Sequence, residues 1–148
     1  MKTRKHIGMV ALIAALYGIS CTGSDAVDNV DAAILSDTAK YTQIQWLDSV
    51  VNFGTINMGE KIQVVFRFKN TGKNPLFLAN VRAGCGCTVP DYTKGAIAPG
   101  GEGVVTGAFD SNKAHAGEVR KSIFVTTNTH NQTRYTLIFT GLIKEVAK

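Results

Sequence analysis

Two cysteines separated by one glycine, Cys85-Gly86-Cys87, are the residues of this chain whose type and spacing best suit chemistry. They lie in a glycine-rich turn that directly follows a strand-like run, residues 76–81. Thiols this close together can form a disulfide, share a soft metal ion or exchange with another thiol. The sequence leaves these three interpretations open.

A disulfide between positions i and i+2 needs a tight turn, because Cα atoms more than about 7 Å apart cannot be bridged. Gly86 permits such a turn. A loop this short gains little entropic stabilisation, so a bridge between Cys85 and Cys87 would act as a local structural brace. A strained small-ring disulfide is also easily reduced, which suits thiol–disulfide exchange, although no thioredoxin-type β-α-β pattern surrounds it.

Soft-metal binding is the other use of the pair, since thiolates select Cu(I) or Zn(II). Two thiolates are too few for a closed zinc site, so a further ligand must come from elsewhere in the chain. If successive strands alternate in direction, Met58 and His115 share the pole of the cysteine pair, whereas His130 lies at the opposite pole. Met58 and His115 are therefore the candidate helper ligands. Arg82 would lower the pKa of the thiols if it pointed at them.

Other catalytic signatures are missing from the sequence: it has no glycine-rich phosphate loop, no Gly-x-Ser-x-Gly elbow and no histidine pair in helical spacing. Asp110, Ser111 and His115 are the residue types of a catalytic triad, but they lie within six residues of one loop. A triad is assembled from segments that are distant in sequence. We therefore expect that the protein is not an enzyme.

The N-terminus has the pattern of an export signal. Lys2, Arg4 and Lys5 precede an uncharged apolar run, residues 7–19, that is shorter than the about 20 residues needed to span a bilayer. Gly18-Ile19-Ser20-Cys21 resembles a bacterial lipobox, in which the cysteine is acylated with fatty acids such as palmitate. We predict a lipoprotein signal peptide over residues 1–20 and a lipid on Cys21 that attaches the protein to a bacterial cell-envelope membrane, at the outer membrane or facing the periplasm. The alternative is an ordinary cleaved signal, which leaves Cys21 as a free thiol.

Loss of the leader changes the charge of the chain. Residues 1–20 contain three basic residues and no acidic one, so Lys and Arg fall from 16 to 13 against 11 acids, a net charge of +2. No cluster of basic residues interleaved with aromatic ones remains. We therefore expect no nucleic-acid partner.

Residues 21–45 are predicted to form an acidic tether, because their apolar surface is too small to repay the entropy of ordering them. Two tripeptides, Asp37-Thr38-Ala39 and Asp48-Ser49-Val50, match a short bacterial O-glycosylation sequon. Tripeptides of this kind occur often by chance, and we interpret both as ordinary surface sequence. Residues 46–146 are predicted to form the folded domain.

Within this domain, short strand patterns alternate with turns. Ile62, Val64, Phe66 and Phe68 alternate with mostly polar residues, the pattern of a strand with one face on a core. Residues 49–53 are predicted to be a strand that ends at Gly54, and Pro90 places residues 89–94 at a sheet edge. The remaining strands are expected over residues 76–81, 104–109, 119–127 and 134–143. About seven short strands in about 100 residues predict an all-β fold, an immunoglobulin-like antiparallel β-sandwich.

A series of short motifs carries a family resemblance. In chain order they are Asn52-Phe-Gly54, Met58-Gly-Glu60, Phe68-Lys-Asn70-Thr-Gly72, Pro75-Leu76, Cys85-Gly-Cys-Thr88, Ala98-Pro-Gly100 and Phe109-Asp-Ser111. They resemble a bacterial domain-of-unknown-function family, number 1573, which is similar to Hydin-type immunoglobulin-like domains. The resemblance implies exported, often lipid-anchored proteins with no established activity. Together with the residues it favours a non-enzymatic interaction module for an unidentified envelope protein or surface ligand, with metal or redox handling by the cysteine pair as the alternative.

Overall fold

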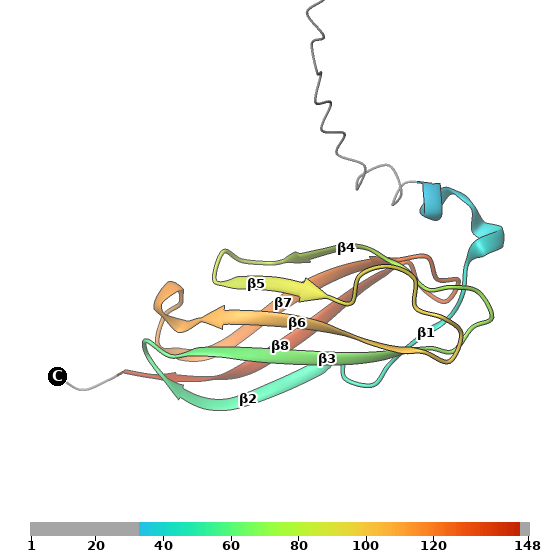
Figure 1. Cartoon of the computed structure of the whole chain (residues 1–148). Helices are drawn as coiled ribbons and strands as arrows, with labels where there is room; N and C mark the ends of the chain where they lie inside the picture. Colours follow the sequence, from blue (N-terminus) through green and yellow to red (C-terminus); the bar gives the residue numbers. More distant parts are fainter. Residues whose placement is uncertain (1–32, 146–148) are drawn as a thin grey trace, which may run out of the picture.

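Two four-stranded sheets packed face to face form the domain in a computed structural model, which describes residues 33–145 (Figure 1). One sheet has the strand order β1-β3-β6-β5 and the other β2-β8-β7-β4. The strands are β1 (Ile44–Trp46), β2 (Val50–Asn57), β3 (Lys61–Asn70), β4 (Leu78–Ala83), β5 (Thr88–Tyr92), β6 (Glu102–Asp110), β7 (Gly117–Thr127) and β8 (Arg134–Lys144). Two short 3-10 helices accompany them, η1 (Thr38–Lys40) and η2 (Ser111–Lys113). The predicted immunoglobulin-like sandwich is confirmed.

The predicted leader, Cys21 and the first part of the tether lie outside the described residues. Within residues 33–145, none of the helices has the length and apolar character required to cross a bilayer.

The core follows the strand alternation that the sequence predicts. Phe66 and Phe68 of β3 are 0% exposed, and Val64 is buried beside them, whereas Ile62 is half-buried at the end of the strand. The opposite sheet contributes Leu137 and Phe139 of β8, both fully buried. The two sheets therefore interdigitate through alternate residues of each strand, as expected for a sandwich.

Glycines within strands make room for aromatic rings in this core. A Cβ atom on Gly103 of β6 would overlap the ring of Phe68, its cross-strand partner, and one on Gly141 of β8 would overlap the ring of Phe53. Each ring thus lies directly on the neighbouring backbone. A side chain at either glycine would force a ring out of the core, where overpacking typically costs about 1–3 kcal/mol.

Two expectations about β2 are wrong. Gly54 does not end the strand: it has a positive φ of 77° at a register shift between Asn52 and Thr55, and β2 continues to Asn57. This is the geometry of a β-bulge, in which glycine tolerates the positive φ and the strand bends without ending. β2 also pairs in parallel with β8, so the sandwich is not wholly antiparallel.

β5 is an edge strand, as Pro90 predicts. The Asp110 N–H donates to the Cys87 carbonyl and the Thr93 N–H to the Val104 carbonyl, so residues 87, 89, 91 and 93 face β6. At position 90 a backbone N–H would therefore point away from the sheet, and proline has no backbone N–H. On the other sheet, edge strand β4 has a register shift between Leu78 and Asn80.

Two buried asparagines close the end of the sandwich where the chain enters it. The Asn70 side chain accepts from the Thr42 hydroxyl and donates to the carbonyls of Asn74 and Ile97. The Asn128 side chain accepts from the Phe77 N–H and donates to the carbonyls of Lys40 and Pro75. These contacts fix three loops and the segment before β1. This segment, and the start of β1 at Ile44, belong to residues 21–45, which the sequence assigns to the tether.

The core makes a direct stability prediction. Phe66→Ala should lower the free energy of unfolding by about 3–5 kcal/mol, the usual cost of deleting a fully buried aromatic ring. Gln63→Ala, on the exposed face of the same strand, should cost less than about 0.5 kcal/mol. Chemical denaturation followed by circular dichroism measures both, and equal losses would contradict the register.

Candidate functional site

Cys85 and Cys87 are joined by a disulfide at the turn between β4 and β5, with their Cα atoms 5.3 Å apart. Cys85 is half-buried against the core and Cys87 is 5% exposed. The Thr88 hydroxyl lies 3.6 Å from the Cys85 sulfur and 3.8 Å from the Cys87 sulfur. Gly86 stands exposed between the cysteines, with open space where a side chain would be.

This bridge adds little to the stability of the fold. Cross-linking a loop of about three residues removes chain entropy worth about 1.6 kcal/mol, against about 4.7 kcal/mol for a loop of about 100 residues. The large buried aromatic cluster already holds the two sheets together. The bridge therefore fixes the local shape of the turn.

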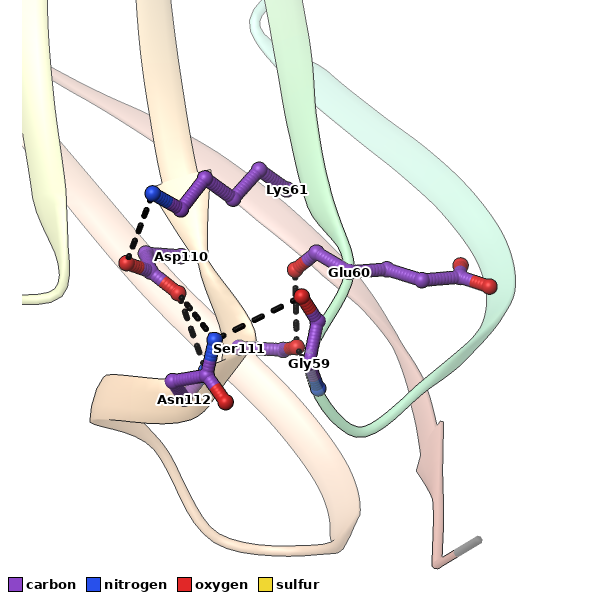
Figure 2. A network of polar contacts seen from close by, with 6 residues as sticks. All are labelled: Gly59, Glu60, Lys61, Asp110, Ser111 and Asn112. Carbon is purple, nitrogen blue, oxygen red and sulfur yellow. Dashed lines mark hydrogen bonds and ion pairs between the residues drawn. The ribbon is translucent and has the colours of Figure 1, made fainter.

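Three loops meet at the pole that holds the disulfide (Figures 1 and 2). Ser111, which is 0% exposed, accepts a hydrogen bond from the Gly59 N–H and donates to the Glu60 carbonyl at 2.7 Å. The Ser111 N–H also donates to the Glu60 carbonyl, so the β6–β7 loop is tied to the β2–β3 turn. The Asp110 N–H donates to the Cys87 carbonyl, which ties the same loop to the disulfide turn.

The Asp110 carboxylate belongs to this network, drawn in Figure 2. Partial burial tends to raise the pKa of its carboxyl, but hydrogen bonds from the Asn112 backbone and side chain and the charge of Lys61 outweigh it, so the pKa lies below its ordinary value. The Lys61 ammonium lies 3.6 Å from the carboxylate. The side chains of Asp110 and Ser111 thus both contact groups of the loops at this pole, and they hold these loops in place.

The predicted helper ligands lie at this same pole. Met58 is half-buried in the β2–β3 turn and packs against the core, and His115 is exposed in the loop after η2. His130 is at the far pole, where its N–H donates to the Thr42 carbonyl. Within residues 33–145, no three His, Cys, Asp or Glu side chains gather in a way that could hold a metal ion. Binding of Cu(I) or Zn stays a prediction that requires the bridge to be reduced.

Arg82 does not point toward the disulfide. It stands on the outer face of β4, with its guanidinium 4.6 Å from the centre of the Phe124 ring, whereas Cys85 packs against the core. Two lysines, Lys61 and Lys113, line a groove of about 220 Å³ beside Cys87. Val89, which is 67% exposed, is part of the same groove.

A second groove, of about 470 Å³, lies on the outer face of the β2-β8-β7-β4 sheet. The register sets Asn80, Thr126 and Arg134 in one row across β4, β7 and β8, and Arg82, Phe124 and Thr136 in the next. Arg82 leans over Phe124 and hence toward the middle of the groove. Sequence reasoning missed this site, because alternation places both arginines outward but does not say which strands are neighbours.

The two outer faces of the sandwich differ in how their cations are paired. On the β1-β3-β6-β5 sheet, Lys61, Arg67 and Lys69 each lie within 4.0 Å of a carboxylate. On the other sheet, Arg82 and Arg134 form no ion pair with any residue that the structure describes. The second groove also has no carboxylate among its lining residues.

The polar network predicts the effect of removing one hydroxyl. Ser111→Ala should lower the free energy of unfolding by about 1 kcal/mol, because the hydroxyl's hydrogen bonds with the Gly59 N–H and the Glu60 carbonyl are lost, while the Ser111 N–H still donates to that carbonyl. Lys113→Ala, two residues on and exposed, should cost less than about 0.5 kcal/mol. Urea denaturation measures both, and an unchanged midpoint for Ser111→Ala would contradict a supporting role.

Solved structures show where else this fold occurs. A protein of unknown function from Porphyromonas gingivalis W83 matches with a TM-score of 0.62 and 16% identity, over 72% of this chain and 49% of that one. The Vibrio cholerae VesB protease matches with a TM-score of 0.56 and 20% identity, over 68% of this chain and 32% of that one. Human CEP192 PapD-like domain 7 matches with a TM-score of 0.52 and 12% identity, over 97% of this chain and 100% of the domain.

At these identities the structural likeness shows the fold alone, and this chain spans about half or less of the first two proteins. No curated protein matches the chain. The family model described as "Protein of unknown function (DUF1573)" matches residues 44–143, from the start of β1 almost to the end of β8. The chain therefore belongs to the DUF1573 family of proteins of unknown function.

Proposed function

We propose that the protein is a non-enzymatic interaction module, held at a bacterial envelope by a lipid on Cys21, which binds a partner bearing carboxylate or phosphate groups. The groove that contains Arg82 and Arg134 supports this proposal. Arginine presents a planar fork of donors that matches a carboxylate or phosphate with two parallel hydrogen bonds. The groove gives two such forks and no competing carboxylate.

The positions of the two arginines suit a single anionic group. β4 and β8 are separated by one strand, so their backbones are about 10 Å apart. Arg82 shortens this gap, because its guanidinium lies over Phe124 on the intervening strand. Stacking on the ring also orders the Arg82 side chain before a partner arrives, which reduces the entropy lost on binding.

The surroundings of the arginines add neutral hydrogen-bonding groups. Asn80, Thr126 and Thr136 line the groove between and beside the two guanidinium groups. Their amide and hydroxyl groups can bind further oxygens of the same partner. A rigid β-sheet holds all of these side chains, as a preorganised binding site requires.

Charge-matched variants test the groove. The Arg82→Ala, Arg134→Ala double variant should bind phosphocellulose at least about ten-fold more weakly than the wild-type protein, because two charge-assisted contacts are lost. The control, Arg67→Ala with Lys69→Ala, removes the same charge from the opposite face, where both cations already have carboxylate partners. Its affinity should change less than about two-fold. Equal losses of affinity in the two double variants would show that only net charge matters, and would contradict anion binding at the groove that contains Arg82 and Arg134.

The anchor is tested separately. Cys21→Ala should move the protein from the membrane fraction to the soluble fraction, since no lipid is then attached. The intact mass of the variant shows whether the leader is still present, because a retained leader would also hold the chain at the membrane. An unmodified Cys21 in the mature wild-type protein would contradict the lipid anchor.

A further inference from the structure

We propose that the Cys85–Cys87 disulfide is a thiol–disulfide exchange site that accepts two electrons from the dithiol of a partner protein. The site lies at the opposite end of the sandwich from the loops that Asn70 and Asn128 close, and it does not depend on the arginine groove. Three features support exchange: the size of the loop, the unequal exposure of the two sulfurs, and the groove beside them.

The loop that the bridge closes contains only Gly86. Opening so small a ring releases little chain entropy, and the segments on both sides stay bound to the sheets. Gly84 donates its N–H to the Ser122 carbonyl on β7, and the Cys87 carbonyl accepts from the Asp110 N–H on β6. The domain can therefore keep its fold in both redox states.

The two sulfurs have different surroundings. Cys85 is the more exposed of the two, and Gly86 beside it has no side chain to shield the bridge. Cys87 is buried, and the Thr88 hydroxyl, 3.6 Å from the Cys85 sulfur and 3.8 Å from the Cys87 sulfur, can donate to either one. An incoming thiolate can therefore reach the Cys85 sulfur, while the Cys87 thiolate that leaves is stabilised by a hydrogen bond.

The exchange proceeds in two steps, in which atoms and electrons balance. A partner thiolate attacks the Cys85 sulfur, the S–S bond breaks, and its electron pair leaves on Cys87 as a thiolate. The second partner thiolate then attacks the partner sulfur of this mixed disulfide, forms the partner's own disulfide and releases the Cys85 thiolate. The two thiolates of this chain take up the two protons lost by the partner dithiol, so the partner is oxidised and this chain is reduced.

The groove of about 220 Å³ beside Cys87 gives the partner a place to dock. Val89 and Ala108 give it an apolar wall, and Lys113 contributes a positive charge. Lys113 forms no ion pair within residues 33–145, whereas Lys61 in the same groove pairs with Asp110. A nearby ammonium stabilises a thiolate and lowers the pKa of its thiol.

The test uses the full chain carrying Cys21→Ala, so that Cys85 and Cys87 are the only cysteines of the three that remain. Dithiothreitol is the dithiol probe, and the open bridge is trapped by acid and alkylation and counted by mass spectrometry. The bridge should open while the circular dichroism spectrum stays that of the folded domain. Opening only at urea concentrations that unfold the domain would overturn the proposal.

Matched variants test the assigned roles. Lys113→Ala should slow opening by about three-fold or more, whereas Lys73→Ala, an exposed lysine in the β3–β4 loop, should leave the rate unchanged. With oxidised glutathione, the Cys85 thiol of Cys87→Ser should form a mixed disulfide at least about ten-fold faster than the Cys87 thiol of Cys85→Ser. Equal rates in the lysine comparison would contradict the role of Lys113, and equal rates in the cysteine comparison would contradict the proposed direction of attack.

Discussion

The hydrogen bonds of two buried amide side chains are the constraint on which the arrangement of this domain depends. Asn70 and Asn128 are both 0% exposed, and each donates to a carbonyl of the β3–β4 loop, Asn74 and Pro75 respectively, that accepts no backbone hydrogen bond within residues 33–145. Leaving such groups unpaired in the interior costs about 1–3 kcal/mol each. At the opposite end, a short network around Ser111 ties the β6–β7 loop to the β2–β3 turn, and the disulfide turn and its groove lie beside it.

Much of the fold can be predicted from the sequence, because alternation reports which residues share a face. The inward set of β3 and the edge position of Pro90 follow from residue types alone. The parallel pairing of β2 with β8 does not, since both strands alternate in the same way whichever neighbour they have. The bulge at Gly54 was missed for a related reason: a glycine ends one strand and bends another, and tertiary packing decides between them. β1, only three residues long, is too short to show a period.

The candidate sites are predictable to different degrees. Met58, His115 and the cysteine pair share a pole because loops at alternate strand ends do so, and this required only the strand order along the chain. The orientation of Arg82 is set by Phe124, which lies more than forty residues later in the sequence and is brought beside it by β4–β7 pairing. The arginine groove likewise depends on which strand lies next to which, which a single sequence does not reveal.

The missing N–H of Pro90 has a consequence for how copies of this protein meet. An extended segment from another chain attaches to a sheet by matching donors and acceptors along an open edge. At β5 the proline interrupts the donors in the middle of a strand of five residues, and at β4 the register shift bends the edge. Strand-to-strand growth, the first step toward fibrils, is therefore disfavoured along this side of the sandwich even where many copies are crowded onto one surface.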